Sequence, residues 1–160
     1  MATGKTSVGK ELSRRLKKSF LDLDDLIEDK ENMRIVDIFS QKGEAYFRKL
    51  EQKAIEEVSL KKDLIIGCGG GAVVNPDNLD KLKKSGVVIC LIADIDTILK
   101  RSKGTDKRPL LNVDNPNDRV KELLSKREQY YKQAHYSIDT SILSVKQVVD
   151  NIIEIINKEA

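Results

Sequence analysis

Short apolar segments alternate with helical patterns along most of this chain, and this alternation constrains the fold more than any other feature. The apolar segments lie at residues 20–24, 64–68, 87–93 and 137–140. The segment at 87–93 is apolar throughout, which is typical of a parallel strand covered on both faces. Strands that alternate with helices predict an α/β fold with three layers, α/β/α, around a central parallel sheet. In such folds ligands bind at the carboxyl ends of the strands.

The helical patterns have ordinary start and stop signals. Val8, Leu12 and Leu16 recur at the spacing of about one helical turn, so a helix is expected from about residue 6 onward. Pro76 and Gly86 stand at the first position and just past the last position of another helix. Further helices are expected near residues 25–31, 35–43, 44–59, 118–135 and 145–157, and directly after residue 94.

Length and charge indicate a single domain that spans residues 1–160. With 160 residues, of which 39% are hydrophobic, the chain is long enough to bury a sizeable core. Its 29 Lys and Arg against 26 Asp and Glu give a net charge of +3, which is too small to indicate a nucleic-acid partner. Four Tyr, three Phe and no Trp also provide no platform for stacking bases. We expect a monomer that binds small molecules and no nucleic acid.

The cysteines and the hydropathy indicate a cytoplasmic protein. Cys68 and Cys90 stand inside apolar runs, as buried reduced thiols do. Together with His135 they lack the spacing of a zinc site, and they form no disulfide framework. The longest apolar run, 87–93, is far shorter than the roughly 18 residues that span a bilayer, and the N-terminus has no apolar signal core. We therefore expect a reducing compartment and no membrane association.

The clearest chemical motif is Gly4-Lys5-Thr6-Ser7, at the start of the first expected helix. A phosphate-binding loop ends in G-K-[ST], where backbone amides surround phosphate oxygens, the lysine supplies a positive charge and the hydroxyl reaches a magnesium ion. The full pattern has another glycine five residues before this one and a strand before that, whereas only residues 1–3 stand there in this sequence. Taken alone, the fragment is also consistent with an ordinary helix start.

Acidic and glycine clusters follow two of the expected strands. Asp22 and Asp24 alternate along a strand, so both carboxylates reach one site only if the strand ends between them. One could then hold magnesium through its waters while the other accepts a hydrogen bond from a substrate hydroxyl, the alternative being two solvated aspartates. Gly69, Gly70 and Gly71 follow a buried strand, where three glycines indicate that the backbone closely approaches a ligand.

Three arginines are open to a functional and to a surface interpretation. Arg48 lies on the expected helix at 44–59, where it can pair with a nearby glutamate, and Arg127 has charged neighbours on a later helix. Arg108 lies in an aperiodic segment at about 102–118, and segments of this length are often functional lids. On a lid, an arginine can close over nucleotide phosphates as arginine fingers do; otherwise it is a solvated loop charge.

Taken together and in order, six segments resemble shikimate kinase, a small P-loop kinase of the nucleoside-monophosphate-kinase-like type. They are GKTSVGKELSRRL, FLDLDDLIE, IVDIFSQKGEAYFRKLE, GCGGGAV, KRPLL and SKREQYY. Each is modest alone, but together they are specific and extend over essentially the whole chain. The resemblance implies a P-loop kinase-like fold, ATP and Mg²⁺ as cofactors, and phosphorylation of the 3-hydroxyl of shikimate, a step of chorismate and aromatic amino acid biosynthesis.

The same resemblance implies a role for each candidate residue at the phosphate end of the site. Residues 4–7 would bind ATP, with Lys5 on the phosphates and Thr6 also on magnesium. Asp22 would organise the magnesium ion. Arg108 would contact ATP and the transferring phosphoryl group.

At the acceptor end, the resemblance implies that Asp24 contacts the shikimate hydroxyls and orients or deprotonates the attacking 3-hydroxyl. Arg48 and Arg127 would hold the shikimate carboxylate, and the glycines at 69–71 would line the pocket. The implied catalytic residues are thus Lys5, Asp24 and Arg108.

The departure from the family pattern lies at the start of the chain. The family has a strand and the first half of the phosphate loop there, so we expect the first strand to be missing from the sheet, as in a shortened chain that begins at an internal methionine. The amides that bind the β-phosphate are then incomplete. Two alternatives stay open: a non-catalytic module that binds shikimate or regulates, and a related small-molecule kinase such as a gluconate kinase.

Overall fold

The computed structural model describes residues 2–102 and 115–159, which form an α/β fold. The elements are α1 (Lys5–Leu16), β1 (Ser19–Asp22), α2 (Leu23–Glu31), α3 (Ile35–Lys42), α4 (Glu44–Val58), β2 (Leu64–Gly67), η1 (Ala72–Val74), α5 (Pro76–Ser85), β3 (Ile89–Ile92), α6 (Ile95–Ser102), α7 (Pro116–Tyr131), β4 (Tyr136–Asp139) and α8 (Val145–Glu159). Every strand and helix expected from the sequence is present. The clearest difference is α7, which begins and ends earlier in the chain than the expected 118–135.

The strands pair in parallel, but in two separate pairs. Ser19 of β1 lies opposite Leu64 of β2, and Ile89 of β3 lies opposite Tyr136 of β4. Within residues 2–102 and 115–159 no strand joins β2 to β3, so the central sheet expected from the sequence is divided in two. A cavity of about 1230 Å³ is bordered by residues of both β2 and β3 and extends to the N-terminus of α1. Among the described residues, no backbone lies between the two strands to which both could hydrogen-bond.

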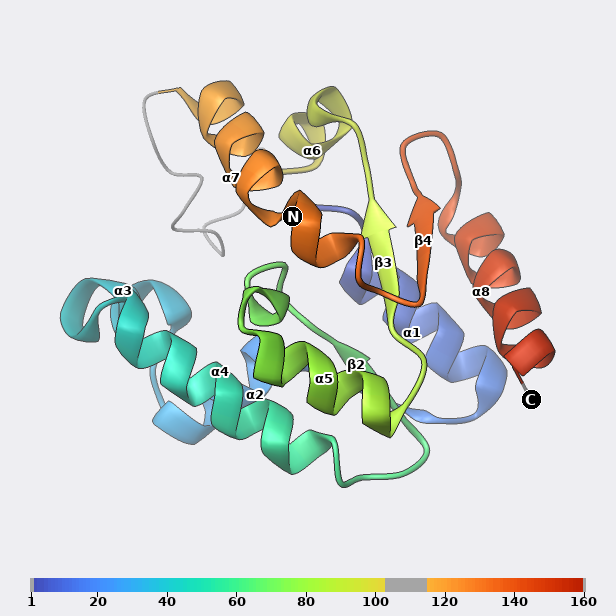
Figure 1. Ribbon diagram of the computed structural model, residues 1–160, viewed down its shortest axis with the longest axis horizontal. Coiled ribbons are helices and arrows are strands. Elements are labelled where there is room, and N and C mark those ends of the chain that lie inside the picture. The colour runs from blue at the N-terminus through green and yellow to red at the C-terminus, as the bar shows by residue number, and fades with distance from the viewer. Residues whose placement is uncertain (1, 103–114, 160) are drawn as a thin grey trace.

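Helices cover both faces of β2, and its alternate side chains enter different cores. Ile65 packs against the cluster that includes Val8 of α1 and Val149 of α8. Leu64 and Ile66 pack against the other cluster, which is built from α2, α3, α4 and α5. Figure 1 shows α1 and α8 on one side of the strands and α4 and α5 on the other. The expected three-layer α/β/α arrangement is therefore confirmed.

Close packing of α1 on the sheet sets the position of its N-terminus. A Cβ atom on Gly9 would lie only 2.2 Å from the ring of Phe20, so glycine allows the helix to approach β1. Just before the helix, the Thr3 carbonyl accepts a hydrogen bond of 3.0 Å from the Thr140 hydroxyl, which lies at the end of β4. The start of α1 is thereby fixed at the carboxyl ends of the strands, where the sequence places the ligand site.

The cysteines are free thiols, as expected, but both are partly exposed and not fully buried. Burial raises the pKa of the Cys68 thiol to about 12, and it also raises the pKa of Cys90. In the described ranges, no helix combines the length and the apolarity that crossing a bilayer requires.

Candidate active site

The phosphate-loop fragment forms the N-terminal turn of α1. Gly4 has a φ of 91°, a left-handed conformation that favours glycine, and the helix begins at the next residue. Lys5, Thr6 and Ser7 are therefore the first helical residues, and no acidic side chain occupies this turn. Backbone N–H groups and the helix dipole make such a terminus attractive to an anion. The four residues predicted to bind phosphate stand together at a site suited to it.

Asp22 connects this turn to the end of β1. Its carboxylate accepts a hydrogen bond of 2.9 Å from Lys5 Nζ and one of 3.0 Å from Thr6 Oγ1. It also caps α2, because the backbone N–H of Asp24 donates to Oδ1 at 3.1 Å. The strand ends at Asp22, so the condition for both aspartates to reach one site is met. The alternative of two solvated aspartates is wrong for Asp22, which is buried.

Asp24 lies in the first turn of α2 and faces the same lysine. Its Oδ2 is 3.8 Å from Lys5 Nζ. Burial raises the pKa of the Asp24 carboxyl, the positive charge of Lys5 opposes that shift, and the nearby Asp22 adds to it. The Asp24 carboxylate thus binds a proton more readily than that of an ordinary aspartate. This property suits a group that takes a proton from a hydroxyl.

The donor set at this turn suits magnesium better than it suits a softer metal. The Thr6 hydroxyl and the Asp22 carboxylate are hard oxygen ligands at 3.0 Å from each other. Among the described residues there is no cluster of three or more His, Cys, Asp or Glu that would enclose a metal. Magnesium retains several waters and takes few protein ligands when phosphate oxygens supply the rest. Thr6 and Asp22 therefore fit a magnesium ion that arrives with a nucleotide.

The glycine segment, residues 69–71 after β2, lies against the side chains of Asp24 and Arg48. A Cβ atom on Gly69 would lie 3.5 Å from Asp24 Oδ1, which is an ordinary contact. One on Gly71 would lie 2.5 Å from Nη1 of Arg48, which is closer than real Cβ atoms approach. The backbone at Gly71 is therefore close to the protein's own Arg48, and the approach of the segment to a ligand stays a prediction.

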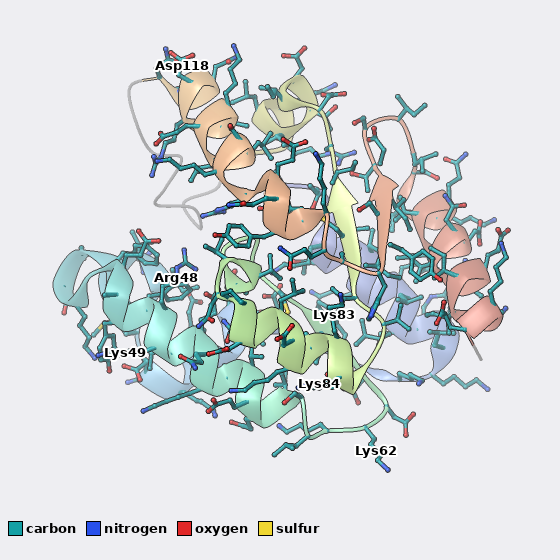
Figure 2. All side chains as sticks on the ribbon, viewed as in Figure 1. Arg48, Lys49, Lys62, Lys83, Lys84 and Asp118 are labelled. Carbon is teal, nitrogen blue, oxygen red and sulfur yellow. The ribbon has the colours of Figure 1, made fainter. Side chains whose placement is uncertain are left out.

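Arg48 extends from α4 toward this glycine segment and is held by two glutamates. Its Nη1 lies 2.8 Å from Glu51 Oε2 and its Nη2 lies 2.9 Å from Glu44 Oε1. Glu51 is only 2% exposed, and burial raises its pKa while Arg48 lowers it. In Figure 2, Arg48 and Lys49 leave α4 on different sides, and Lys49 is exposed. Pairing with glutamate, the expected surface role, thus coexists with a place in the site.

Arg127 lies on α7 across the glycine segment and is buried, at 8% exposure. The surface interpretation of this arginine is wrong, since the face of α7 that carries it packs on η1 and the glycines. A Cβ atom on Gly70 would lie 3.6 Å from Arg127 Nη1. In the described part of the chain, no carboxylate forms an ion pair with this guanidinium. A buried cation in that state is suited to an anion from outside the protein.

Sequence reasoning did not single out two further residues of the site, Glu51 and Tyr131. Glu51 follows Arg48 by three residues and Tyr131 follows Arg127 by four, so helical spacing places each on the face of an arginine. This spacing was the feature of the sequence that could have identified Glu51 and Tyr131. Arg108 and most of the expected lid at 102–118 lie outside the described residues.

Comparisons with known proteins agree on one family. The family described as "Shikimate kinase" matches residues 1–157. A shikimate kinase of Thermoanaerobacter pseudethanolicus is 43% identical over 154 residues, covering 96% of this chain and 90% of the relative. One of Thermodesulfovibrio yellowstonii is 45% identical, covering 96% of this chain and 89% of the relative.

Comparisons with solved structures indicate the same family. The shikimate kinase from Acinetobacter baumannii in complex with shikimate superposes with a TM-score of 0.96 at 35% identity, covering 99% of this chain and 89% of that one. The enzyme from Aquifex aeolicus superposes with a TM-score of 0.83 at 31% identity, covering 99% of this chain and 92% of that one. By sequence and by fold, this chain belongs to the shikimate kinase family.

Proposed function

We propose that this protein transfers the γ-phosphoryl group of ATP to the 3-hydroxyl of shikimate. The observation that carries the proposal is the pair of arginines around the glycine segment, above all Arg127, which is buried and forms no ion pair with a described carboxylate. Shikimate has one carboxylate and several hydroxyls. Guanidinium groups match the carboxylate, while Asp24 and the backbone of Gly69–Gly71 offer partners for the hydroxyls.

On the acceptor side, Asp24 orients the attacking hydroxyl and takes its proton. Its position beside Gly69 supports this role, as does its raised pKa, which makes it a better base than an ordinary aspartate. Arg48 and Arg127 bind the carboxylate and so fix the orientation of the ring. Positioning of this kind is a large part of catalysis in phosphoryl transfer, where the protein does little covalent chemistry.

On the donor side, the first turn of α1 and the Lys5 ammonium group bind the ATP phosphates. Thr6 and Asp22 would hold magnesium, which supplies neutralisation of the charge on the phosphates when bound. Lys5 is already directed toward Asp22 and Asp24, so one cation lies between the two halves of the site. The role of Arg108 on the transferring group stays a prediction from the sequence. We also expect the enzyme to act as a monomer.

The test is ADP release with ATP and magnesium, with and without shikimate, measured on this chain and on a version extended at its N-terminus by a strand and the first loop glycine. Shikimate-dependent release by either protein supports the proposal. Calorimetry with shikimate and with ATP-magnesium accompanies the assay, because shikimate binding without ATP binding or turnover in either protein would indicate a binding module instead. Equal or better turnover of gluconate would overturn the choice of substrate.

A further inference from the structure

The carbonyl groups of the glycine segment are satisfied in two different ways. Those of Gly69 and Gly71 accept local hydrogen bonds from the backbone N–H groups of Ala72 and Val74, at 3.0 and 3.2 Å. The carbonyl of Gly70 instead accepts a hydrogen bond of 3.1 Å from the hydroxyl of Tyr131, which is 61 residues away in sequence. Of these three hydrogen bonds, only the last joins the segment to another helix, because Tyr131 lies at the end of α7.

The close approach of Tyr131 depends on glycine. A Cβ atom on Gly70 would lie 2.5 Å from the Tyr131 hydroxyl oxygen, closer than real Cβ atoms come to another atom. The same helix carries Arg127 one turn earlier, and its guanidinium lies on the same side of Gly70. Gly70 thus receives a hydrogen bond from the face of α7 that also carries Arg127.

A bond at this carbonyl has an effect one residue further on. The Gly70 carbonyl and the Gly71 N–H belong to one planar peptide unit, so fixing the direction of the first fixes the second. The Gly71 N–H donates to no acceptor in the described part of the chain. Three consecutive glycines have more backbone conformations than any other tripeptide, so a contact from outside the segment adds to the two local bonds in fixing this plane.

We propose that Tyr131 is a positioning residue of the acceptor pocket: its hydrogen bond to the Gly70 carbonyl holds the glycine segment at a set distance from Arg127 and directs the Gly71 N–H toward the substrate. This inference rests on the proposed function, since the substrate it concerns is shikimate. The hydroxyl itself does not touch the reacting atoms. Its removal should therefore alter binding of the acceptor and leave the phosphoryl transfer step unchanged.

The test compares Tyr131→Phe with Tyr130→Phe, which removes the same atom from the adjacent residue of the same helix. Calorimetry should show about three- to tenfold weaker shikimate binding for Tyr131→Phe alone, the usual effect of one neutral hydrogen bond. ATP affinity and melting temperature should match those of the wild type. Where turnover is measurable, the KM for shikimate should rise with kcat unchanged. A purely structural role would instead lower the melting temperature and change both affinities.

Hydrogen exchange without substrate gives a readout that does not depend on the proposed function. The amides of Ala72 and Val74, whose bonds close the glycine segment, should exchange faster in Tyr131→Phe than in Tyr130→Phe. Unchanged exchange overturns the inference, and so does faster exchange with unchanged shikimate affinity. A third outcome is that the wild type binds no shikimate while exchange responds as expected. The proposed function would then be wrong, and so would the role of Tyr131 in the acceptor pocket. The hydrogen bond of Tyr131 would still be shown to order the glycine segment.

Discussion

The ammonium group of Lys5 lies 2.9 Å from one carboxylate oxygen of Asp22 and 3.8 Å from one of Asp24. One cation at the N-terminus of α1 is thus shared by two acidic side chains, one at the end of β1 and the other in the first turn of α2. The position brings the turn proposed to bind phosphate and the residue proposed to bind the acceptor within reach of a single charge.

Replacing that charge should abolish most of the activity. We expect Lys5→Ala to lower kcat by about 100-fold or more, the usual loss when a group that stabilises transition-state charge is removed. Lys10→Ala, an exposed lysine on the same helix, is the control and should behave as wild type. The measurement is shikimate-dependent ADP release. A loss of less than fivefold in Lys5→Ala would contradict the role given to this lysine.

The pH dependence of catalysis should report Asp24. Its pKa is raised above the ordinary aspartate value of 3.8, chiefly by burial, and only the ionised form accepts a proton. We therefore expect kcat/KM to fall on acidification at a pH above 3.8. Asp25→Asn should leave this acid limb in place, whereas Asp24→Asn should remove nearly all activity. NMR titration of the Asp24 carboxyl checks the assignment, and in Lys5→Ala its pKa should rise further because the opposing charge is gone.

Stability should depend on pH through the Arg48–Glu51 pair. The pKa of Glu51 is raised from the ordinary glutamate value of 4.5, so its ionised form costs stability once the pH exceeds that value, and Arg48 offsets part of this cost. Arg48→Ala should raise the pKa further and lower the free energy of unfolding by about 3 kcal/mol at pH 8, with a smaller loss at pH 5. Urea unfolding at both pH values measures it, with Lys49→Ala as the control. Equal losses at the two pH values would contradict this account.

Glycine should be required at position 71, because the guanidinium of Arg48 leaves no room for a larger side chain. Gly71 has an ordinary φ of −86°, so alanine would be tolerated by the backbone and would act only through its contact with Arg48. We expect Gly71→Ala to displace that side chain and raise the KM for shikimate about tenfold, with little change in the KM for ATP. Gly86→Ala is the matched control, since its Cβ would meet nothing within 4 Å. Steady-state kinetics with each substrate varied separates the two effects.

Cys68 should react slowly with alkylating reagents in the folded protein. A pKa of about 12 against an ordinary thiol value of 9.0 means roughly a thousandfold less thiolate at pH 8. Iodoacetamide labelling followed by mass spectrometry should modify Cys68 far more slowly than the same residue in urea. Rapid labelling in the native state would show that the thiol is less enclosed than its surroundings suggest.

The sequence was sufficient to predict the elements of the fold and the residues that gather at the strand ends, because glycine, proline and apolar spacing act locally. Whether β1 ends between Asp22 and Asp24 stayed open in the sequence, because the alternating pattern continues to residue 24; in the structure the strand ends at Asp22. Burial of Arg127 could not be predicted from the sequence, because a helix with charges on several faces does not reveal which face packs on another element. The position of Glu51 between Arg48 and Gly69 likewise depends on how α4 meets a loop from a distant part of the chain.

The division of the strands into two pairs also determines which peptide groups border the cavity. β2 and β3 each pair on one edge only within the described residues, and the other edge borders the cavity between them. Peptide groups on an open edge bond to any extended chain that reaches them, and Ile92 at the end of β3 is 40% exposed. An extended segment that entered the cavity would therefore meet unpaired peptide groups on two sides at once.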